Sequence, residues 1–158
     1  MIISNIQLGK AVIVDPTSAI NNVIIGDGVK IAKYCSIFGS EHALLEIGSG
    51  SYVGMFSIIN GFAAKVSIGK QVSIAQRVNI MADSGPNAST FMQQFYPIVT
   101  MPVKIGDHCW IGANAIIMPG VELGECCVVA ANAYVDRSFP PYSVIGGTPA
   151  RLLKTIAR

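Results

Sequence analysis

The chain has 158 residues, of which 13% are charged, and its formal net charge is +2. This small charge gives no strong attraction to nucleic acid or acidic membranes. The mean hydropathy of +0.52 is high, yet no run of about 18 apolar residues predicts a transmembrane helix, and the first residues lack the pattern of a signal peptide. We therefore expect one cytoplasmic domain that buries part of its apolar surplus between subunits.

Aliphatic residues recur every six positions along most of the chain. Series of this kind begin at Ile25, Ile47 and Ile68, and the longest runs from Ile105 to Val135. A period of six differs from the 3.6 of an α-helix and the 2 of a strand. It is typical of a parallel β-helix, in which three hexapeptides make one triangular coil of about 18 residues. We therefore predict an all-β fold built of stacked coils.

A second register supports this fold. The residue four places after each aliphatic position should also point inward, because side chains alternate along a strand. All of these positions hold small or slim residues, as a narrow prism requires: Val29, Cys35, Ser51, Ser57, Val72, Val78, Cys109, Ala115, Val121, Cys127 and Ala133. Many aliphatic residues are followed by Gly, which suits tight corners.

The repeat is interrupted at defined places. Residues 1–24 are predicted to form an irregular first coil, and short insertions follow Ile37, around His42, and Ile59, around Phe62. The step from Ile68 to the next coil start is 37 residues instead of 18, so about 19 residues leave the prism in a protruding loop, residues 81–103. Long loops on compact scaffolds are usually functional. The apolar residues of this loop are expected to pack against the prism or a neighbouring subunit: Phe91, Met92, Phe95, Tyr96 and Pro97.

The repeat ends after Val135. We expect the β-helix domain to span residues 1–138 and a turn with a short basic helix to span residues 139–158. Thr148 would be the N-cap of this helix and Pro149 its first residue.

The cysteines and histidines argue against a metal site. Three of the four cysteines occupy inward positions, where free Cys behaves as a small hydrophobe, and we expect them to be reduced. No CxxC pair exists, and the chain has two His, His42 and His108. A carbonic anhydrase on this fold would need three His ligands, so no metal is expected. His108 is interpreted as a solvent-facing side chain.

The segment IGDHCWIGANAIIMPGVELGECCVVAANAYVDRSFPPYSVIGGTPARLLK, residues 105–154, resembles the hexapeptide-repeat acyltransferases, in particular their sugar, maltose/galactoside and xenobiotic acetyltransferase branch. The elements IGxxxWIG, PGV and GxPAR carry this resemblance. It implies a left-handed parallel β-helix, a homotrimer, acetyl-CoA as acyl donor and active sites between subunits.

The resemblance also implies site residues. Trp110 matches the Trp beside the acceptor pocket; burial at the trimer interface is its other interpretation. Ala113 and Ala131 match positions whose backbone groups bind the pantetheine arm. Three basic residues match positions near the CoA phosphates, where charge-assisted contacts are favourable; solvated cations near a helix C-terminus are their other interpretation: Arg137, Arg151 and Lys154.

The resemblance fails at the catalytic base, which in this family is a His near the start of the long loop. The corresponding residues are Gly85 or Pro86, and the loop has no His. Asp83 is the first candidate for the base and His42, at the same corner two coils away, is the second. Asp83 could instead cap a turn. Ser84 and Asn87, in the same turn, are candidates for binding the acceptor.

Three functions remain open from the sequence. The chain could be an acetyltransferase for a sugar hydroxyl, which needs a general base because an alcohol is a weak nucleophile. It could be an N-acetyltransferase for an amino sugar, which needs little help from a base. It could also be a trimeric scaffold that binds CoA or only assembles. A role in cell-surface polysaccharide synthesis is expected, and modification of an antibiotic or xenobiotic is a further alternative.

Overall fold

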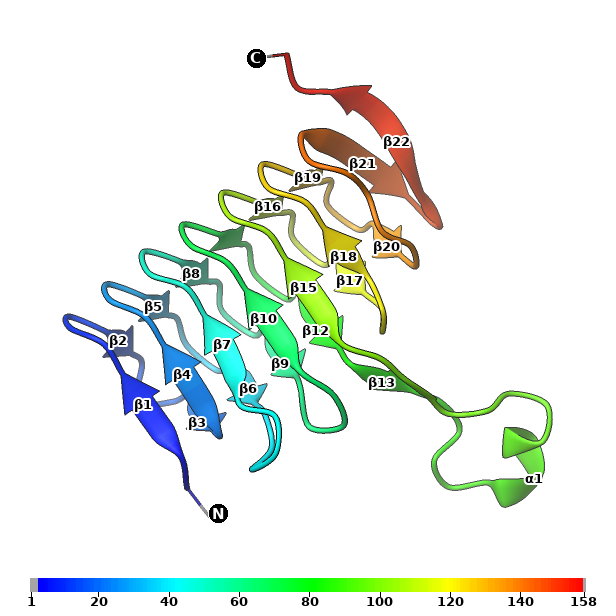
Figure 1. Ribbon diagram of the computed structural model, residues 1–158, viewed down its shortest axis with the longest axis horizontal. Helices are drawn as coiled ribbons and strands as arrows, with labels where there is room; N and C mark the ends of the chain where they lie inside the picture. Colours follow the sequence, from blue (N-terminus) through cyan, green and yellow to red (C-terminus); the bar gives the residue numbers. More distant parts are fainter. Residues whose placement is uncertain (1–2, 158) are drawn as a thin grey trace.

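The computed structural model describes residues 3–157 and shows a triangular prism of stacked coils (Figure 1). Each coil contributes one short strand to each of three parallel sheets, and each strand pairs with the strand one coil above and one coil below. The N-terminal coil lies at one end of the stack and the C-terminal strands at the other. This is the parallel β-helix that the six-residue repeat predicts.

The three sheets are named A, B and C in the order in which the chain visits them. Sheet A contains β1 (Ile6–Leu8), β4 (Val23–Ile25), β7 (Leu45–Ile47), β10 (Val66–Ile68), β15 (Val103–Ile105) and β18 (Glu122–Leu123). Sheet B contains β2 (Ile13–Val14), β5 (Lys30–Ile31), β8 (Tyr52–Val53), β11 (Ser73–Ile74), β16 (Trp110–Ile111), β19 (Val128–Val129), β21 (Ser143–Gly147) and β22 (Ala150–Thr155). Sheet C contains β3 (Ala19–Asn21), β6 (Ser36–Phe38), β9 (Ile58–Asn60), β12 (Asn79–Met81), β17 (Ile116–Ile117) and β20 (Tyr134–Val135).

Both inward registers predicted from the sequence fill the interior. Aliphatic residues stack on their equivalents in the next coil, as Ile37, Ile59 and Ile80 do along sheet C. All eleven small or slim residues named above are buried, from Val29 to Ala133. The core is therefore one continuous column along the axis of the prism, and no coil could bury its share alone.

The glycines that follow the aliphatic residues are needed for a different reason from the predicted one. A Cβ added to Gly48 would lie 2.5 Å from the carbonyl carbon of Gly69, and one added to Gly54 would lie 2.5 Å from that of Ala75. Neither glycine has a positive φ. These positions exclude side chains because the next coil passes too close, and not because the backbone needs a special conformation.

The predicted loop leaves the prism between sheets C and A and projects far from it (Figure 1). Its base is an antiparallel pair, β13 (Asp83–Ser84) with β14 (Val99–Thr100), and its tip holds the short helix α1 (Thr90–Gln93). Phe91 and Phe95 contact each other edge to face, at 5.4 Å between ring centroids, but both are more than 60% exposed. These aromatics do not pack against the prism, so that alternative is wrong.

Two predictions about the ends of the chain are also wrong. The first coil is regular, since β1, β2 and β3 each pair with the coil above. The C-terminal helix is absent: β21 continues sheet B beyond residue 138, and β22 folds back antiparallel on it where the basic helix was expected. A helix of about eight residues is marginal by itself, whereas the edge of sheet B offers unpaired backbone groups to a returning strand.

The cysteines occupy the predicted core positions. Cys35, Cys109 and Cys127 are buried, and Cys126 is partly exposed. Burial raises the pKa of the Cys35 thiol. A hydrogen bond with Cys127 and burial raise the pKa of Cys109.

We expect a maleimide at neutral pH to modify one thiol per folded chain, at Cys126, and four after denaturation, because the thiolate is the reactive form and must be accessible. Mass spectrometry of intact protein and of its peptides gives the count and the position. Rapid labelling of Cys35 or Cys109 in the folded chain would contradict this packing.

Candidate functional site

Asp83 lies at the corner where sheet C leads to sheet A, here called the C–A corner. Asp83 and Ser84 form β13 and are half-buried at the base of the loop. The Asn60 side-chain amide donates a hydrogen bond to Asp83 Oδ1 at 3.3 Å, and Asn60 Oδ1 accepts one from the Phe62 backbone N–H at 3.0 Å. These two bonds fix the Asn60 amide and hold the Asp83 carboxylate. Among residues 3–157, no side chain donates a hydrogen bond to Oδ2 of Asp83.

His42 lies at the same corner but not beside Asp83. It is exposed in the insertion between β6 and β7, which is closed by the bridge between Ser40 and Ala43. Asn21, His42 and Phe62 line a groove of about 300 Å³ over the first three coils. Two coil spacings, about 10 Å, separate the coil of His42 from that of Asp83. His42 therefore belongs to the wall of this groove. Asn87 is exposed in the loop and lies neither in this groove nor beside Asp83 at the base of the loop.

Trp110 lies on another side of the prism, on the outer face of sheet B, with 58% of its surface exposed. Ala113 follows at the corner between sheets B and C, here called the B–C corner, and Ala131 occupies the same corner one coil further on. The backbone N–H of Asn132 donates to the Ala113 carbonyl at 2.9 Å, which ties the two corners together. Neither alanine has side-chain atoms beyond Cβ, so an elongated ligand can approach the backbone closely here.

The three candidate cations divide between two places. Arg151 and Lys154 lie on β22, where Arg151 pairs with Gly146 and Lys154 with Val144. Arg137 lies at the C–A corner after β20, 3.4 Å from Asp136. All three are exposed. The structure thus places Arg151 and Lys154 at the C-terminal edge of sheet B, three strands beyond Trp110, but it does not bring Arg137 there.

The predicted site residues therefore form two separate groups within one chain. Asp83, Ser84 and His42 lie along the C–A corner, whereas Trp110 and the two alanines lie on sheet B and the B–C corner. The body of the prism stands between these two sides. A single site that uses both groups would need two copies of the chain.

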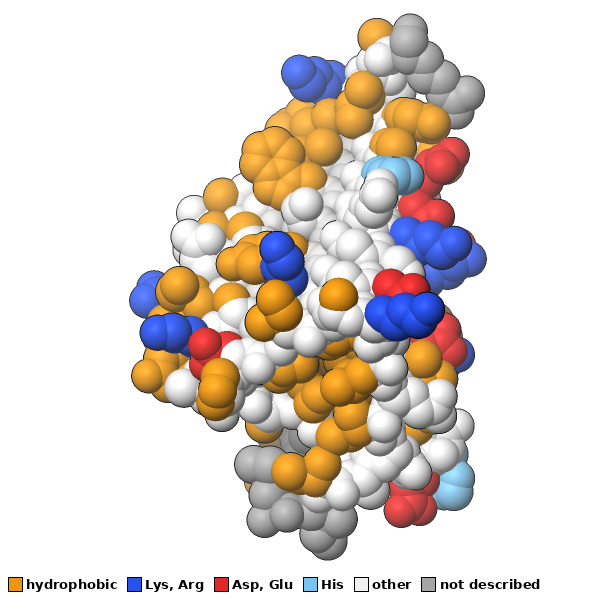
Figure 2. Space-filling view, turned by 90° about the vertical axis from the view of Figure 1, so that its left-hand side faces the viewer, with side chains coloured by type: hydrophobic (Ala, Val, Ile, Leu, Met, Phe, Trp, Pro, Cys, Tyr) orange, Lys and Arg blue, Asp and Glu red, His pale blue; other side chains and the backbone are white. Residues whose placement is uncertain are grey.

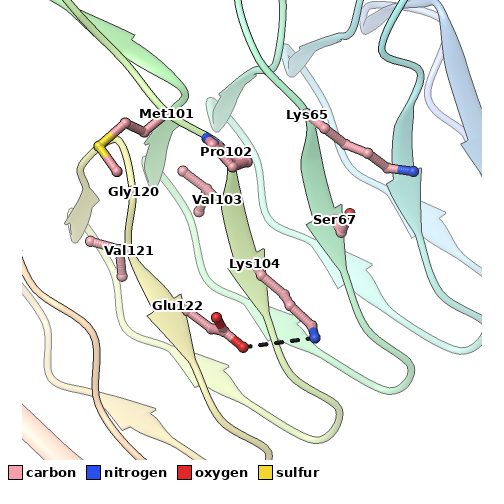
Figure 3. Close-up of a pocket in the computed structure, with 9 residues that line it drawn as sticks. All are labelled: Lys65, Ser67, Met101, Pro102, Val103, Lys104, Gly120, Val121 and Glu122. Carbon is pink, nitrogen blue, oxygen red and sulfur yellow. Dashed lines mark ion pairs between the residues drawn. The ribbon is translucent and has the colours of Figure 1, made fainter.

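The outer face of sheet A holds a pocket of about 280 Å³ beside the base of the loop (Figure 3). Its lysines have acidic partners: Lys104 Nζ lies 3.7 Å from Glu122 Oε1, and Lys65 Nζ lies 2.6 Å from Glu46 Oε1. None of the predicted site residues lines this pocket. Sheet A is thus a charged, ion-paired face, in contrast to sheet B.

An aromatic cluster that was not predicted from the sequence lies at the B–C corner. Tyr34 and Phe56 stack with ring centroids 5.2 Å apart, and the guanidinium of Arg77 lies 5.7 Å from the centre of the Phe56 ring. Each of these residues follows an inward aliphatic residue of sheet B by three positions, so the repeat itself could have revealed the cluster. Figure 2 shows how widely hydrophobic side chains cover one face, with acidic and basic side chains along its right-hand edge and further charged side chains at its left.

Within residues 3–157, no group of three or more His, Cys, Asp or Glu side chains is placed to hold a metal ion. The same residues contain no helix of the length and apolar character needed to cross a membrane. His108, as predicted, is exposed at a corner and takes no part in either group of site residues.

Comparisons with known proteins agree with this architecture. The profile of the family described as "Hexapeptide repeat of succinyl-transferase" matches residues 102–137. The galactoside O-acetyltransferase of Escherichia coli is 28% identical over 121 residues, which are 76% of this chain and 58% of that protein. "Probable acetyltransferase Rv3034c" of Mycobacterium tuberculosis is 30% identical over 148 residues, 93% of this chain and 49% of that protein. The chain thus spans about half the length of these relatives.

Solved structures show the same fold bound to CoA compounds. AntD, an N-acyltransferase from Bacillus cereus solved with dTDP and 3-hydroxybutyryl-CoA, has a TM-score of 0.84 and 27% identity, covering 96% of this chain and 84% of that one. The hexapeptide-repeat acetyltransferase VCA0836 from Vibrio cholerae, solved with acetyl-CoA, has a TM-score of 0.67 and 26% identity, covering 96% of this chain and 72% of that one.

Proposed function

Because this chain belongs to the hexapeptide-repeat acyltransferases, we propose that it transfers an acetyl group from acetyl-CoA to a hydroxyl or amine of a sugar. The observation that carries this proposal is one column of outward-facing residues on sheet B. Trp110 pairs with Val128, Val128 with Val144, and Val144 with Lys154. This column joins the predicted acceptor end of the site to its predicted phosphate end on one continuous face.

The length and chemistry of the column suit an extended acyl donor. Three strand spacings separate Trp110 from Lys154, about 14 Å. Two valines in the middle give an apolar floor, and Ala113 and Ala131 expose backbone groups along the adjoining corner. Arg151 and Lys154 at the far end would form charge-assisted hydrogen bonds with the phosphates of CoA. The thioester would then lie near Trp110.

The catalytic group would come from a second copy of the chain. We propose a homotrimer in which the C–A corner of one copy faces the sheet B column of the next, so that Asp83 meets the thioester end. The exposed aromatics of the loop, Phe91 and Phe95, would pack against the neighbour. Arg137, which is also at the C–A corner, would reach the CoA phosphates only from that neighbouring copy.

The proposed reaction needs few groups. Asp83 takes the proton of the acceptor hydroxyl as the oxygen attacks the thioester carbon. Backbone N–H groups near Trp110 stabilise the negative oxygen of the tetrahedral intermediate. The carbon–sulfur bond then breaks, and CoA leaves with its sulfur protonated by the same Asp83. For an amine acceptor, a neutral amine attacks directly, and positioning supplies more of the rate.

Binding of acetyl-CoA tests the proposal first. We expect acetyl-CoA at 100 times its Kd to stabilise the protein by about 2.7 kcal/mol, measured as a rise in Tm. Arg151→Gln should weaken binding about tenfold or more, because it removes a charge-assisted contact, whereas Lys104→Gln on sheet A should bind normally. No shift at millimolar acetyl-CoA would reject the enzymatic function.

The second candidate function is a trimeric scaffold without catalysis. The observation that favours it is the lack of His in the loop, residues 81–103. A screen for acetyl transfer to neutral sugars, amino sugars and antibiotics, with trimers confirmed by analytical ultracentrifugation, separates the two. The first proposal includes a cytoplasmic location and a role in polysaccharide synthesis. Glycosyltransferase genes beside the gene for this chain would support the role in polysaccharide synthesis.

A further inference from the structure

Asn60 connects two coils at the C–A corner, both by its backbone and by its side chain. It ends β9 and pairs with Met81 in sheet C. Its backbone carbonyl accepts a hydrogen bond from the Ala82 N–H at 3.0 Å, and its side-chain amide donates one to Asp83 Oδ1 at 3.3 Å. A residue of the preceding coil thus holds both the segment that leads into the long loop and the carboxylate that follows it.

The orientation of the Asn60 amide is decided by its second bond. Asn60 Oδ1 accepts from the Phe62 backbone N–H at 3.0 Å, so the amide NH2 group faces Asp83. An amide turned the other way would place two acceptor oxygens against each other, and would set its NH2 group against the N–H donor of Phe62. The amide therefore presents a donor, and not an acceptor, to the carboxylate.

The backbone at Asp83 is fixed by other contacts. Ala82 is fully buried, and its carbonyl accepts from the Met101 N–H at 2.9 Å. Asp83 itself pairs with Thr100 in the antiparallel strands at the base of the loop. These bonds, like the bond to the Asn60 carbonyl, join main-chain atoms. The bond from the Asn60 amide therefore acts on the rotation of the Asp83 carboxylate and not on the position of its backbone.

We propose that Asn60 is a positioning residue for acetyl transfer: it occupies Oδ1 of Asp83, so that Oδ2 is directed to the acceptor and takes the proton of its hydroxyl. This inference rests on the proposed function. As the acceptor oxygen bonds to the thioester carbon, its O–H bond breaks and the proton moves to Oδ2. The same oxygen returns the proton to the sulfur when the carbon–sulfur bond breaks. Asn60 contacts no reacting atom, and its contribution is the orientation of the base.

Asn60→Ala in the full chain tests this inference by steady-state kinetics. We expect kcat for transfer to a sugar hydroxyl to fall about tenfold, because a hydrogen bond to a charged group is lost. KM for acetyl-CoA should stay the same, since the proposed CoA contacts lie on sheet B. A double-mutant cycle with Asp83→Asn separates positioning from a structural effect. Where the base is already removed, Asn60→Ala should change kcat by no more than about twofold, because the two side chains act as one unit.

Asn21→Ala is the matched control. Asn21 lies in the same column of sheet C two coils away, since it pairs with Phe38 and Phe38 pairs with Asn60. Its side-chain oxygen accepts from the Ser4 backbone N–H at 2.8 Å. Asn21→Ala thus also removes a hydrogen bond between coils, but it should leave kcat unchanged.

The outcomes distinguish the inference from the proposed function. Equal losses of kcat in Asn21→Ala and Asn60→Ala overturn the inference, as does a tenfold loss from Asn60→Ala in both backgrounds of the cycle. Wild-type kcat in Asn60→Ala or in Asp83→Asn overturns it as well, while acetyl transfer by the wild type still supports the function. A wild type that binds acetyl-CoA but acetylates no acceptor of the screen rejects the proposed function, and the inference with it.

Discussion

Asp83→Asn is expected to lower kcat for acetyl transfer to a sugar hydroxyl by about 100- to 10,000-fold, the usual contribution of a general base. The substitution keeps the shape of the side chain and its bond from Asn60, but the amide cannot accept the proton. KM for acetyl-CoA should change little, because Asp83 lies on the C–A corner and the proposed CoA contacts lie on sheet B. Steady-state kinetics with the acceptor found by screening give both constants.

Two further variants help to interpret the change in kcat caused by Asp83→Asn. Glu125→Gln removes an exposed carboxylate at the corner between sheets A and B, away from the C–A corner of Asp83, and should leave kcat unchanged. His42→Ala tests the second candidate for the base, which lies about 10 Å from the coil of Asp83. Wild-type kcat in Asp83→Asn would reject Asp83 as the base, and loss in His42→Ala alone would assign that role to His42. Full activity in both would favour an amine acceptor that needs no base.

The largest effect on stability is expected at the core of the prism. Ile59→Ala should lower the free energy of unfolding by about 2 to 5 kcal/mol, the range for such truncations in a core. Ile59 is fully buried and stacks between Ile37 below and Ile80 above. The cavity cannot close readily, because the coils on both sides hold the spacing of the column. Chemical denaturation monitored by circular dichroism measures the loss.

The adjacent residue supplies a matched control. Ile58 has the same side chain and the same strand, but it points outward and is 42% exposed. Ile58→Ala should change the stability by no more than about 0.5 kcal/mol, as surface substitutions usually do. Equal losses in the two variants would contradict the inward and outward register of sheet C.

The repeat predicted most of the fold because it is a local and redundant signal. Every coil must place an aliphatic residue and a slim residue at the same points, so a break such as the one after Ile80 stands out in the sequence. The C-terminal prediction failed for a nonlocal reason. Residues 150–155 carry helix-forming side chains, but they lie beside the open edge of sheet B, and backbone pairing with β21 decides their conformation.

The site was predictable only in part. The resemblance offers Trp110, Ala113 and Arg151 as candidates, because they lie within motifs of contiguous residues, and their roles stay predictions. It gave no positions in space for Asp83 and Trp110, which the structure places on different sides of the prism. The bond from Asn60 to Asp83 and the column from Trp110 to Lys154 join residues of different coils, so they depend on how the coils stack.

The sequence by itself determined the coil, the two inward registers and the place of the long loop, since each depends on spacing along the chain, and it shows that residues 81–103 contain no His. Only the tertiary structure decided which outward residues share a face. Stacking places residues of adjacent coils, from 16 to 37 positions apart in the chain, at one strand spacing. The stacked coils thus create the sheet B column, and with it the surface on which the acyl donor is proposed to lie.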